Sequence, residues 1–168
     1  MRTIIFFFVL ACHFSFSANA QKKITYTSPV SQTKKYVLPD GSEVWLNVKS
    51  TLRLPADFNV KSRTVFLSGD AFFKIKPNKA KPFIIRTAQL VLKSYGASLR
   101  VDAYPSPGEE ADVLTGSVRA RKSYHSTLDN SEYDLGPGQM VMINREIDLI
   151  EKEKFDSTEL KTWLKRFK

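Results

Sequence analysis

Cysteine, histidine and long apolar runs are all scarce in this chain. Cys12 is the only cysteine among the 168 residues, so no disulfide can form within the chain, and no thiol chemistry is available beyond residue 12. His125 is the only histidine after residue 20, which excludes a histidine-based metal cluster in that part of the chain. The apolar run at residues 4–11 is shorter than the roughly 20 residues that cross a membrane.

Motifs for ligand binding and catalysis are also missing. The glycines at 41, 69, 96, 116, 136 and 138 adjoin strand-like runs, and none forms a phosphate-binding loop before a helix. Glu109 and Glu110 are neighbours in a predicted loop, where adjacent side chains point in unrelated directions. His125 lies in a polar segment and is predicted to be a solvated surface residue. We predict no catalytic, cofactor-binding or metal-binding residues, and no enzyme activity unless folding gathers distant carboxylates in a deep cleft.

The first 20 residues have the pattern of a secretory signal peptide. A short positive start and the apolar run precede an Ala-Asn-Ala sequence that ends at Ala20, which predicts cleavage between Ala20 and Gln21. His13 and Ser15 interrupt the run and argue against a membrane anchor. The sequence Val-Leu-Ala-Cys that ends at Cys12 resembles a lipobox, so a lipoprotein anchored at Cys12 is the alternative to a free periplasmic protein.

Acidic residues are the less abundant charge. The chain has 26 lysines and arginines against 17 aspartates and glutamates, a formal net charge of +9. A basic exported protein suggests an acidic protein partner, an anionic membrane face or peptidoglycan. The basic residues are spread along the chain rather than gathered in one stripe, and export makes nucleic acid an unsuitable partner.

Residues 38–47, with the sequence LPDGSEVWLN, indicate how the folded part begins. The Pro-Asp-Gly sequence at residues 39–41 favours a chain reversal, because proline presets φ and glycine accepts positive φ. Val44 and Leu46 then alternate with Trp45, which is the period of a β-strand. We predict a hairpin here, with Trp45 buried in the strand.

Short alternating runs and polar turns continue as far as residue 144. Gly69 is predicted to allow a tight reversal between two strands, and the Thr-Gly sequence at residues 115–116 is predicted to join a hairpin. Residues 105–110, PSPGEE, are the strongest loop signal. About ten short strands at roughly 8-residue to 12-residue spacing predict an all-β sandwich or a solenoid-like roll.

The end of the chain has helical rather than strand periodicity. Asp156 or Ser157 can cap a helix, and apolar side chains then recur at i, i+3, i+4 and i+7. The predicted helix face consists of Leu160, Trp163, Leu164 and Phe167. This face either packs on its own domain or binds a partner groove or an anionic membrane. The predicted organisation is a signal peptide at 1–20, a β domain at 21–150 and a helical tail at 151–168.

Eight motifs occur together in the order and spacing of one known family. They are LPDGSEVWLN at 38–47, LRLPADF at 52–58, VFLSGDAFFKI at 65–75, KPFIIRT at 81–87, SYGASLRV at 94–101, AYP at 103–105, LTGSVRAR at 114–121 and LGPGQMV at 135–141. In combination they resemble the periplasmic domain of the FecR family, the sensor and anti-sigma proteins of bacterial cell-surface signalling. Leu99 and Arg100 stand where family members often carry Phe and Asn.

The resemblance implies an all-β roll outside the inner membrane and a role in signalling. In full-length family members a cytoplasmic sigma-binding segment and a membrane span precede this domain, and a small domain that contacts a TonB-dependent transporter follows it. Because a predicted signal peptide precedes the domain here, we expect contact with an envelope protein, such as a TonB-dependent transporter or a sensor, rather than direct control of a sigma factor. The alternative is a structural protein associated with peptidoglycan or polysaccharide.

Overall fold

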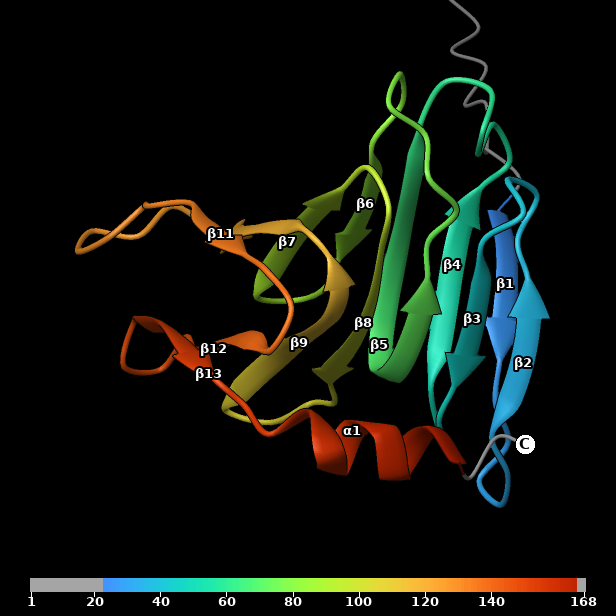
Figure 1. The fold of residues 1–168 in the computed structure, drawn as a ribbon. Coiled ribbons are helices and arrows are strands. Elements are labelled where there is room, and N and C mark those ends of the chain that lie inside the picture. The colour runs from blue at the N-terminus through green and yellow to red at the C-terminus, as the bar shows by residue number, and fades with distance from the viewer. Residues whose placement is uncertain (1–22, 166–168) are drawn as a thin grey trace, which may run out of the picture.

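The computed structural model of the protein describes residues 23–165, with the side chain of Glu159 excepted. These residues form thirteen strands and one C-terminal helix (Figure 1). The strands are β1 (Lys23–Thr27), β2 (Lys34–Val37), β3 (Glu43–Leu46), β4 (Thr51–Pro55), β5 (Arg63–Lys74), β6 (Phe83–Arg86), β7 (Leu90–Ser94), β8 (Ala97–Ala103), β9 (Gly108–Gly116), β10 (Val118–Lys122), β11 (Tyr133–Leu135), β12 (Gln139–Asn144) and β13 (Leu149–Lys154). The helix is α1 (Ser157–Leu164). The predicted all-β fold with a terminal helix is confirmed, with more strands than the ten expected.

The strands form two layers that share the long strand β5. Sheet A has the order β1-β4-β5-β6-β7-β10-β11, and sheet B has the order β2-β3-β5-β8-β9-β12-β13. Only β5 and β6 pair in parallel among the described strands, and all the other pairs are antiparallel. Inward-facing apolar side chains of both sheets, such as Phe73 and Phe83 with ring centroids 6.2 Å apart, form one core.

Gly69 does not reverse the chain, so that prediction was wrong. Strand β5 continues through Gly69, whose φ is 101°, and changes sheets there. Its residues before Gly69 pair with β4 and β6, whereas Gly69 and the residues after it pair with β3 and β8. A Cβ at Gly69 would lie 2.4 Å from the Ser50 hydroxyl oxygen. Glycine is therefore required by the close approach of Ser50 as well as by φ.

The predicted hairpin at residues 115–116 is also wrong. Strand β9 pairs with β8 and β12 in sheet B, whereas β10 pairs with β7 and β11 in sheet A. Gly116, with φ of 78°, lies where the chain crosses between the layers. The predicted loop at 105–110 is shorter than expected, because β9 already begins at Gly108.

The predicted hairpin at residues 39–41 is confirmed, because β2 and β3 pair on either side of it. The carboxylate of Asp40 in this turn lies 2.7 Å from the guanidinium of Arg63, and both side chains are almost fully buried. Arg63 also donates to the carbonyls of Lys76 and Lys81. A buried charge needs this degree of pairing, so Arg63 fixes the turn against the start of β5. Trp45 is half-buried on the outer side of β3, not in the core.

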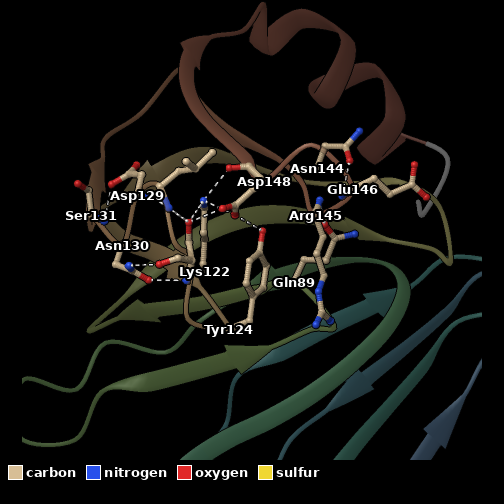
Figure 2. A network of polar contacts seen from close by, with 12 residues as sticks. Gln89, Lys122, Tyr124, Asp129, Asn130, Ser131, Asn144, Arg145, Glu146 and Asp148 are labelled. Atoms are coloured by element: carbon tan, nitrogen blue, oxygen red, sulfur yellow. Dashed lines mark hydrogen bonds and ion pairs between the residues drawn. The ribbon is translucent and has the colours of Figure 1, made fainter.

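A polar network ties the loop after β10 to the turn between β12 and β13 (Figure 2). The buried ammonium of Lys122 donates to the hydroxyl of Ser126 (3.1 Å), to the carboxylate of Asp148 (2.8 Å) and to the Asp148 carbonyl (2.8 Å). The Tyr124 hydroxyl donates to the same carboxylate at 3.2 Å. Because a lysine ammonium has three donors, Lys122 has none left for a ligand. The network joins two loops.

Helix α1 begins as the sequence predicted. The carboxylate of Asp156 accepts a hydrogen bond from the Thr158 amide at 2.8 Å, which is N-cap geometry. In Figure 1 the helix runs along the bottom of the view, from the end of β13 toward β3 and β4. No helix within residues 23–165 is long and apolar enough to span a membrane.

Candidate functional site

The outer side of sheet B gathers carboxylates around one arginine. Strand alternation on β8 turns Leu99 and Val101 into the core and Arg100 and Asp102 outward. The register places Asp70 of β5 opposite Asp102, Glu110 of β9 opposite Asp102, and Asp112 of β9 opposite Arg100. We call Asp70, Arg100, Asp102, Glu110 and Asp112 the carboxylate cluster.

Arg100 is the centre of this cluster. Its Nε lies 3.1 Å from Asp70 Oδ1 and its Nη2 lies 3.1 Å from Asp70 Oδ2, a two-point contact. Nη2 also donates to Asp102 at 2.9 Å. Nη1 is 3.8 Å from Asp112 Oδ2, which is too long for a hydrogen bond. Arg100 therefore donates hydrogen bonds to Asp70 and Asp102 but is too far from Asp112 to donate one.

Helix α1 covers one side of the cluster. Leu160 is buried, and the ring of Trp163 lies 6.4 Å from the ring of Phe72 and 5.5 Å from the Arg100 guanidinium. A half-open cavity of about 640 Å³ lies between the helix and the sheet. It is lined by Arg100, Glu110, Asp112, Met140, Phe155, Asp156, Thr158, Leu160, Thr162 and Trp163. Ligand sites commonly have this size and this mixture of apolar walls with a few polar groups.

Asp112 is the most perturbed group in the cavity. Its pKa is raised to about 7, mainly by burial and also by the nearby Glu110 carboxylate, while Arg100 acts in the opposite direction. Oδ1 of Asp112 is buried and makes no hydrogen bond with any described residue. Buried polar atoms nearly always have a partner, so this oxygen is an exception in the fold.

The other two groups at the centre of the cluster are perturbed as well. Burial raises the pKa of Asp70, although hydrogen bonds from Arg100 and Asn47 act in the opposite direction. For Arg100, burial disfavours the charged form, but its contacts with Asp70 prevail and raise the pKa. The guanidinium therefore stays charged. Burial still destabilises the charged forms of the carboxylates, because Arg100 compensates for it only in part.

Glu109 and Glu110 point to opposite sides of the sheet because they are consecutive residues of β9. The carboxylate of Glu109 is buried and accepts hydrogen bonds from the Thr87 hydroxyl and the Gln89 amide. Burial raises its pKa against these hydrogen bonds. Glu109 therefore fastens the turn before β7, and only Glu110 faces the cavity.

The gathering of carboxylates raises the question of catalysis. Glycoside hydrolysis needs two carboxyl groups separated by at least about 5 Å, so that the sugar fits between them. The Glu110 carboxylate instead lies near enough to Asp112 to raise its pKa, while Asp70 and Asp102 are held by Arg100. This geometry does not match that reaction. Within residues 23–165 no group of three histidine, cysteine or acidic side chains is arranged to hold a metal ion.

The residues singled out from the sequence have different outcomes. Leu160 and Trp163 line the cavity, and Leu164 is half-buried. Phe167, Cys12 and the predicted cleavage site at Ala20 and Gln21 lie outside the described residues. His125 is exposed in the loop after β10, as predicted.

The outer side of sheet A carries mainly basic side chains, in contrast to the carboxylates on the outer side of sheet B. Basic side chains from six positions lie on it, and apolar side chains lie between them. They are Lys23, Arg53, Arg86, Lys93, Arg119 and Arg121, with Phe66, Ile84 and Val91. We call this set the basic face. A second half-open cavity, of about 610 Å³, lies over β1, β4, β5 and β6 on it.

Comparisons with known proteins agree with the fold and identify the family. The family model described as FecR protein matches residues 24–119. Two crystal structures of a candidate anti-sigma factor from Parabacteroides distasonis ATCC 8503 are similar, with TM-scores of 0.76 and 0.75 and 30% and 31% sequence identity. The matches cover 85% and 84% of this chain, which spans only 65% and 64% of those chains. No curated protein matches. From the family match over more than half of its length, this chain belongs to the FecR protein family.

Proposed function

We propose that the protein is a non-enzymatic signalling module of the bacterial envelope, which acts by binding another envelope protein. The family match and the likeness to a candidate anti-sigma factor support a signalling role. The observation that carries the proposal is the position of α1 over the carboxylate cluster, with Leu160 buried and Lys161 and Thr162 exposed. An amphipathic helix beside a partly apolar cavity is a surface suited to protein recognition.

The proposed location is the periplasm. Residues 1–20 have the signal-peptide pattern, and the proposed mature protein has a β domain at 21–150 and a helical tail at 151–168. Intact-mass measurement of the protein isolated from the envelope tests this. A chain that begins at Gln21 supports a free periplasmic protein, and a lipid-modified Cys12 supports an anchored one. An unprocessed Met1 would contradict export.

Affinity capture from envelope extract tests the binding role. We expect mass spectrometry to identify an envelope protein, with a TonB-dependent transporter or a sensor as the expected class. Lys161→Glu reverses a charge on the exposed side of α1 and should lower recovery by roughly tenfold, since rim charges govern encounter with a partner. Lys79→Glu, an equally exposed position far along the chain, is the matched control. Equal recovery with both variants would contradict recognition through α1.

The basic face favours a second candidate function, association with peptidoglycan or another anionic polysaccharide. Arginine and lysine side chains interleaved with Phe66 and Ile84 suit an anionic, partly apolar polymer. Sedimentation with purified sacculi tests this, with co-pelleting that weakens at high salt as the expected result. The double variant Arg86→Glu, Arg121→Glu should abolish co-pelleting, whereas Lys161→Glu should leave it unchanged. Parallel sedimentation with anionic lipid vesicles tests membrane contact by α1.

A further inference from the structure

The cavity under α1 has the features of a receptor for a positively charged side chain. We propose that it binds the guanidinium or ammonium group of an arginine or lysine that a partner protein inserts between α1 and the outer side of sheet B. This inference rests on the proposed binding function, because it names the chemistry by which the partner is recognised. It assigns Asp112 and Glu110 as the groups that contact the cation.

The first argument is the unpaired oxygen of Asp112. The side chain of Asp112 is only 7% exposed, and its Oδ1 has no hydrogen-bond partner among the described residues. Arg100 cannot supply one, because its Nε and Nη2 are engaged with Asp70 and Asp102 and its Nη1 is 3.8 Å from the other oxygen of Asp112. Leaving such an oxygen unpaired costs roughly 1–3 kcal/mol. A donor from a ligand would remove this cost.

The second argument is the balance of charge around the cavity. Four carboxylates, those of Asp70, Asp102, Glu110 and Asp112, surround the single guanidinium of Arg100. Asp156 also lines the cavity, although its carboxylate already caps α1. Glu153 of β13 lies opposite Met140 and adds negative charge on the same side of the sheet. Burial is the main cause of the raised pKa of Asp112, and the neighbouring Glu110 carboxylate adds to it.

The third argument is the nature of the walls. Met140, Phe155, Leu160 and Trp163 contribute apolar and aromatic surface beside the carboxylates. Arginine and lysine carry a long aliphatic stem below the charged head, and such stems pack on apolar surface. The volume of about 640 Å³ accommodates a side chain of this length with part of its backbone. A small inorganic cation would leave most of this surface unused.

The test uses Trp163 as the reporter. The chain contains two tryptophans, so Trp45→Phe leaves Trp163 as the only one. We would titrate this variant at about pH 8, where Asp112 is ionised, with N-acetyl-arginine amide and N-acetyl-lysine amide. N-acetyl-citrulline amide has nearly the shape of the arginine probe but no charge and is the matched control. We expect a saturable change in Trp163 fluorescence with a cationic probe, and binding at least roughly tenfold weaker with citrulline.

Substitutions then locate the site. Asp112→Asn keeps the shape of the side chain and should weaken binding of the cationic probe by roughly tenfold or more. Asp134→Asn, on the outer side of sheet A, should leave it unchanged. Equal binding of the arginine and citrulline probes, or unchanged binding in Asp112→Asn, would overturn the proposal. If Asp112→Asn does not fold, the ¹³C carboxyl resonance of Asp112 replaces it, and a pKa that the arginine probe fails to lower would overturn the proposal.

This test is independent of the search for a natural partner. Binding of a cationic probe without capture of any envelope protein would contradict the proposed function and leave the cavity chemistry established. If the protein captures an envelope protein but does not bind the cationic probes, only this inference is contradicted.

Discussion

The two outer faces of the sandwich carry the same kind of ion pair in different surroundings. On sheet A, Arg119 lies 2.7 Å from Asp134, and the two side chains are 51% and 73% exposed. On sheet B, Arg100 lies 3.1 Å from Asp70, and the two side chains are 23% and 1% exposed. Water and salt weaken the exposed pair on sheet A, although its distance is the shorter one. In the pair on sheet B, the Asp70 carboxylate has almost no access to water and depends on Arg100. Burial, rather than the distance between the charged groups, therefore decides on which face the loss of one partner costs more stability.

The difference has a functional consequence. The charged groups of the basic face are largely solvated, so that face can attract an anionic polymer without a specific pocket. The carboxylate cluster is covered by α1 and is not neutralised from within the described chain. Because a buried carboxylate oxygen of this cluster lacks a partner among the described residues, the outer side of sheet B is the face suited to selective recognition of a cation.

Removing Arg100 should produce the largest effect. Arg100→Ala leaves the carboxylate of Asp70 buried without its main partner, and loss of one member of a buried pair typically costs about 3 kcal/mol. We expect the free energy of unfolding, measured by urea denaturation, to fall by about this amount. An unchanged midpoint would mean that the cluster is hydrated, and the contrast between the two faces would disappear.

The packing of α1 on sheet B should give the next largest effect. Leu160 is 4% exposed, and its replacement by alanine should cost about 2 kcal/mol through lost burial and the cavity left behind. The cost should appear mainly as faster amide exchange in α1, since one short helix depends on its tertiary contacts. Lys161→Ala, at an exposed position of α1 that does not line the cavity, is the control and should leave exchange unchanged. Equal exchange in both variants would show that α1 is not docked through Leu160.

The pH dependence of stability should differ in sign between the faces. Because the pKa of Asp112 is raised to about 7 in the fold, the folded state holds a proton that the unfolded state releases near pH 4. Stability contributed by this group is therefore lost as the pH rises from about 4 to about 7. Asp112→Asn should flatten this slope and raise the free energy of unfolding at about pH 8 by on the order of 1 kcal/mol. A slope equal to that of the unsubstituted protein would contradict the assignment.

The smallest effect is expected on the basic face. The hydrogen bond from Arg119 lowers the pKa of Asp134, so the stability from this pair is present above about pH 4 and is lost as the pH falls through the lowered value. Arg119→Ala should change stability only slightly, and added salt should remove the difference because exposed pairs are screened. A loss as large as that of Arg100→Ala would show that the two faces are not distinct.

Local signals in the sequence predicted much of the fold. The turn at residues 39–41 and the N-cap at Asp156 depend on neighbouring residues only, and both were predicted correctly. The predictions at Gly69 and at residues 115–116 failed for a physical reason. A strand that bends into the other sheet has the same alternation and the same glycine as one that turns back, and only the partner strands distinguish the two.

The candidate site could be predicted only in part. The helical period predicted Leu160 and Trp163, which line the cavity, whereas no motif in the sequence indicated Asp102 or Asp112. The decisive contact, between Asp70 and Arg100, joins residues 30 positions apart. Asp70 was missed because it follows Gly69, where the sequence indicated a turn. Burial of both groups follows from the sheet register and from the docking of α1, which no short motif encodes.

The most direct test of the account is the titration of the Asp112 side chain, followed by its ¹³C carboxyl resonance in the folded protein. A covered, carboxylate-rich site with one arginine predicts a pKa of about 7 for Asp112. An ordinary value near 4 would show that water reaches Asp112, and would contradict the claim that Asp112 is buried in a site for a cation between α1 and the outer side of sheet B.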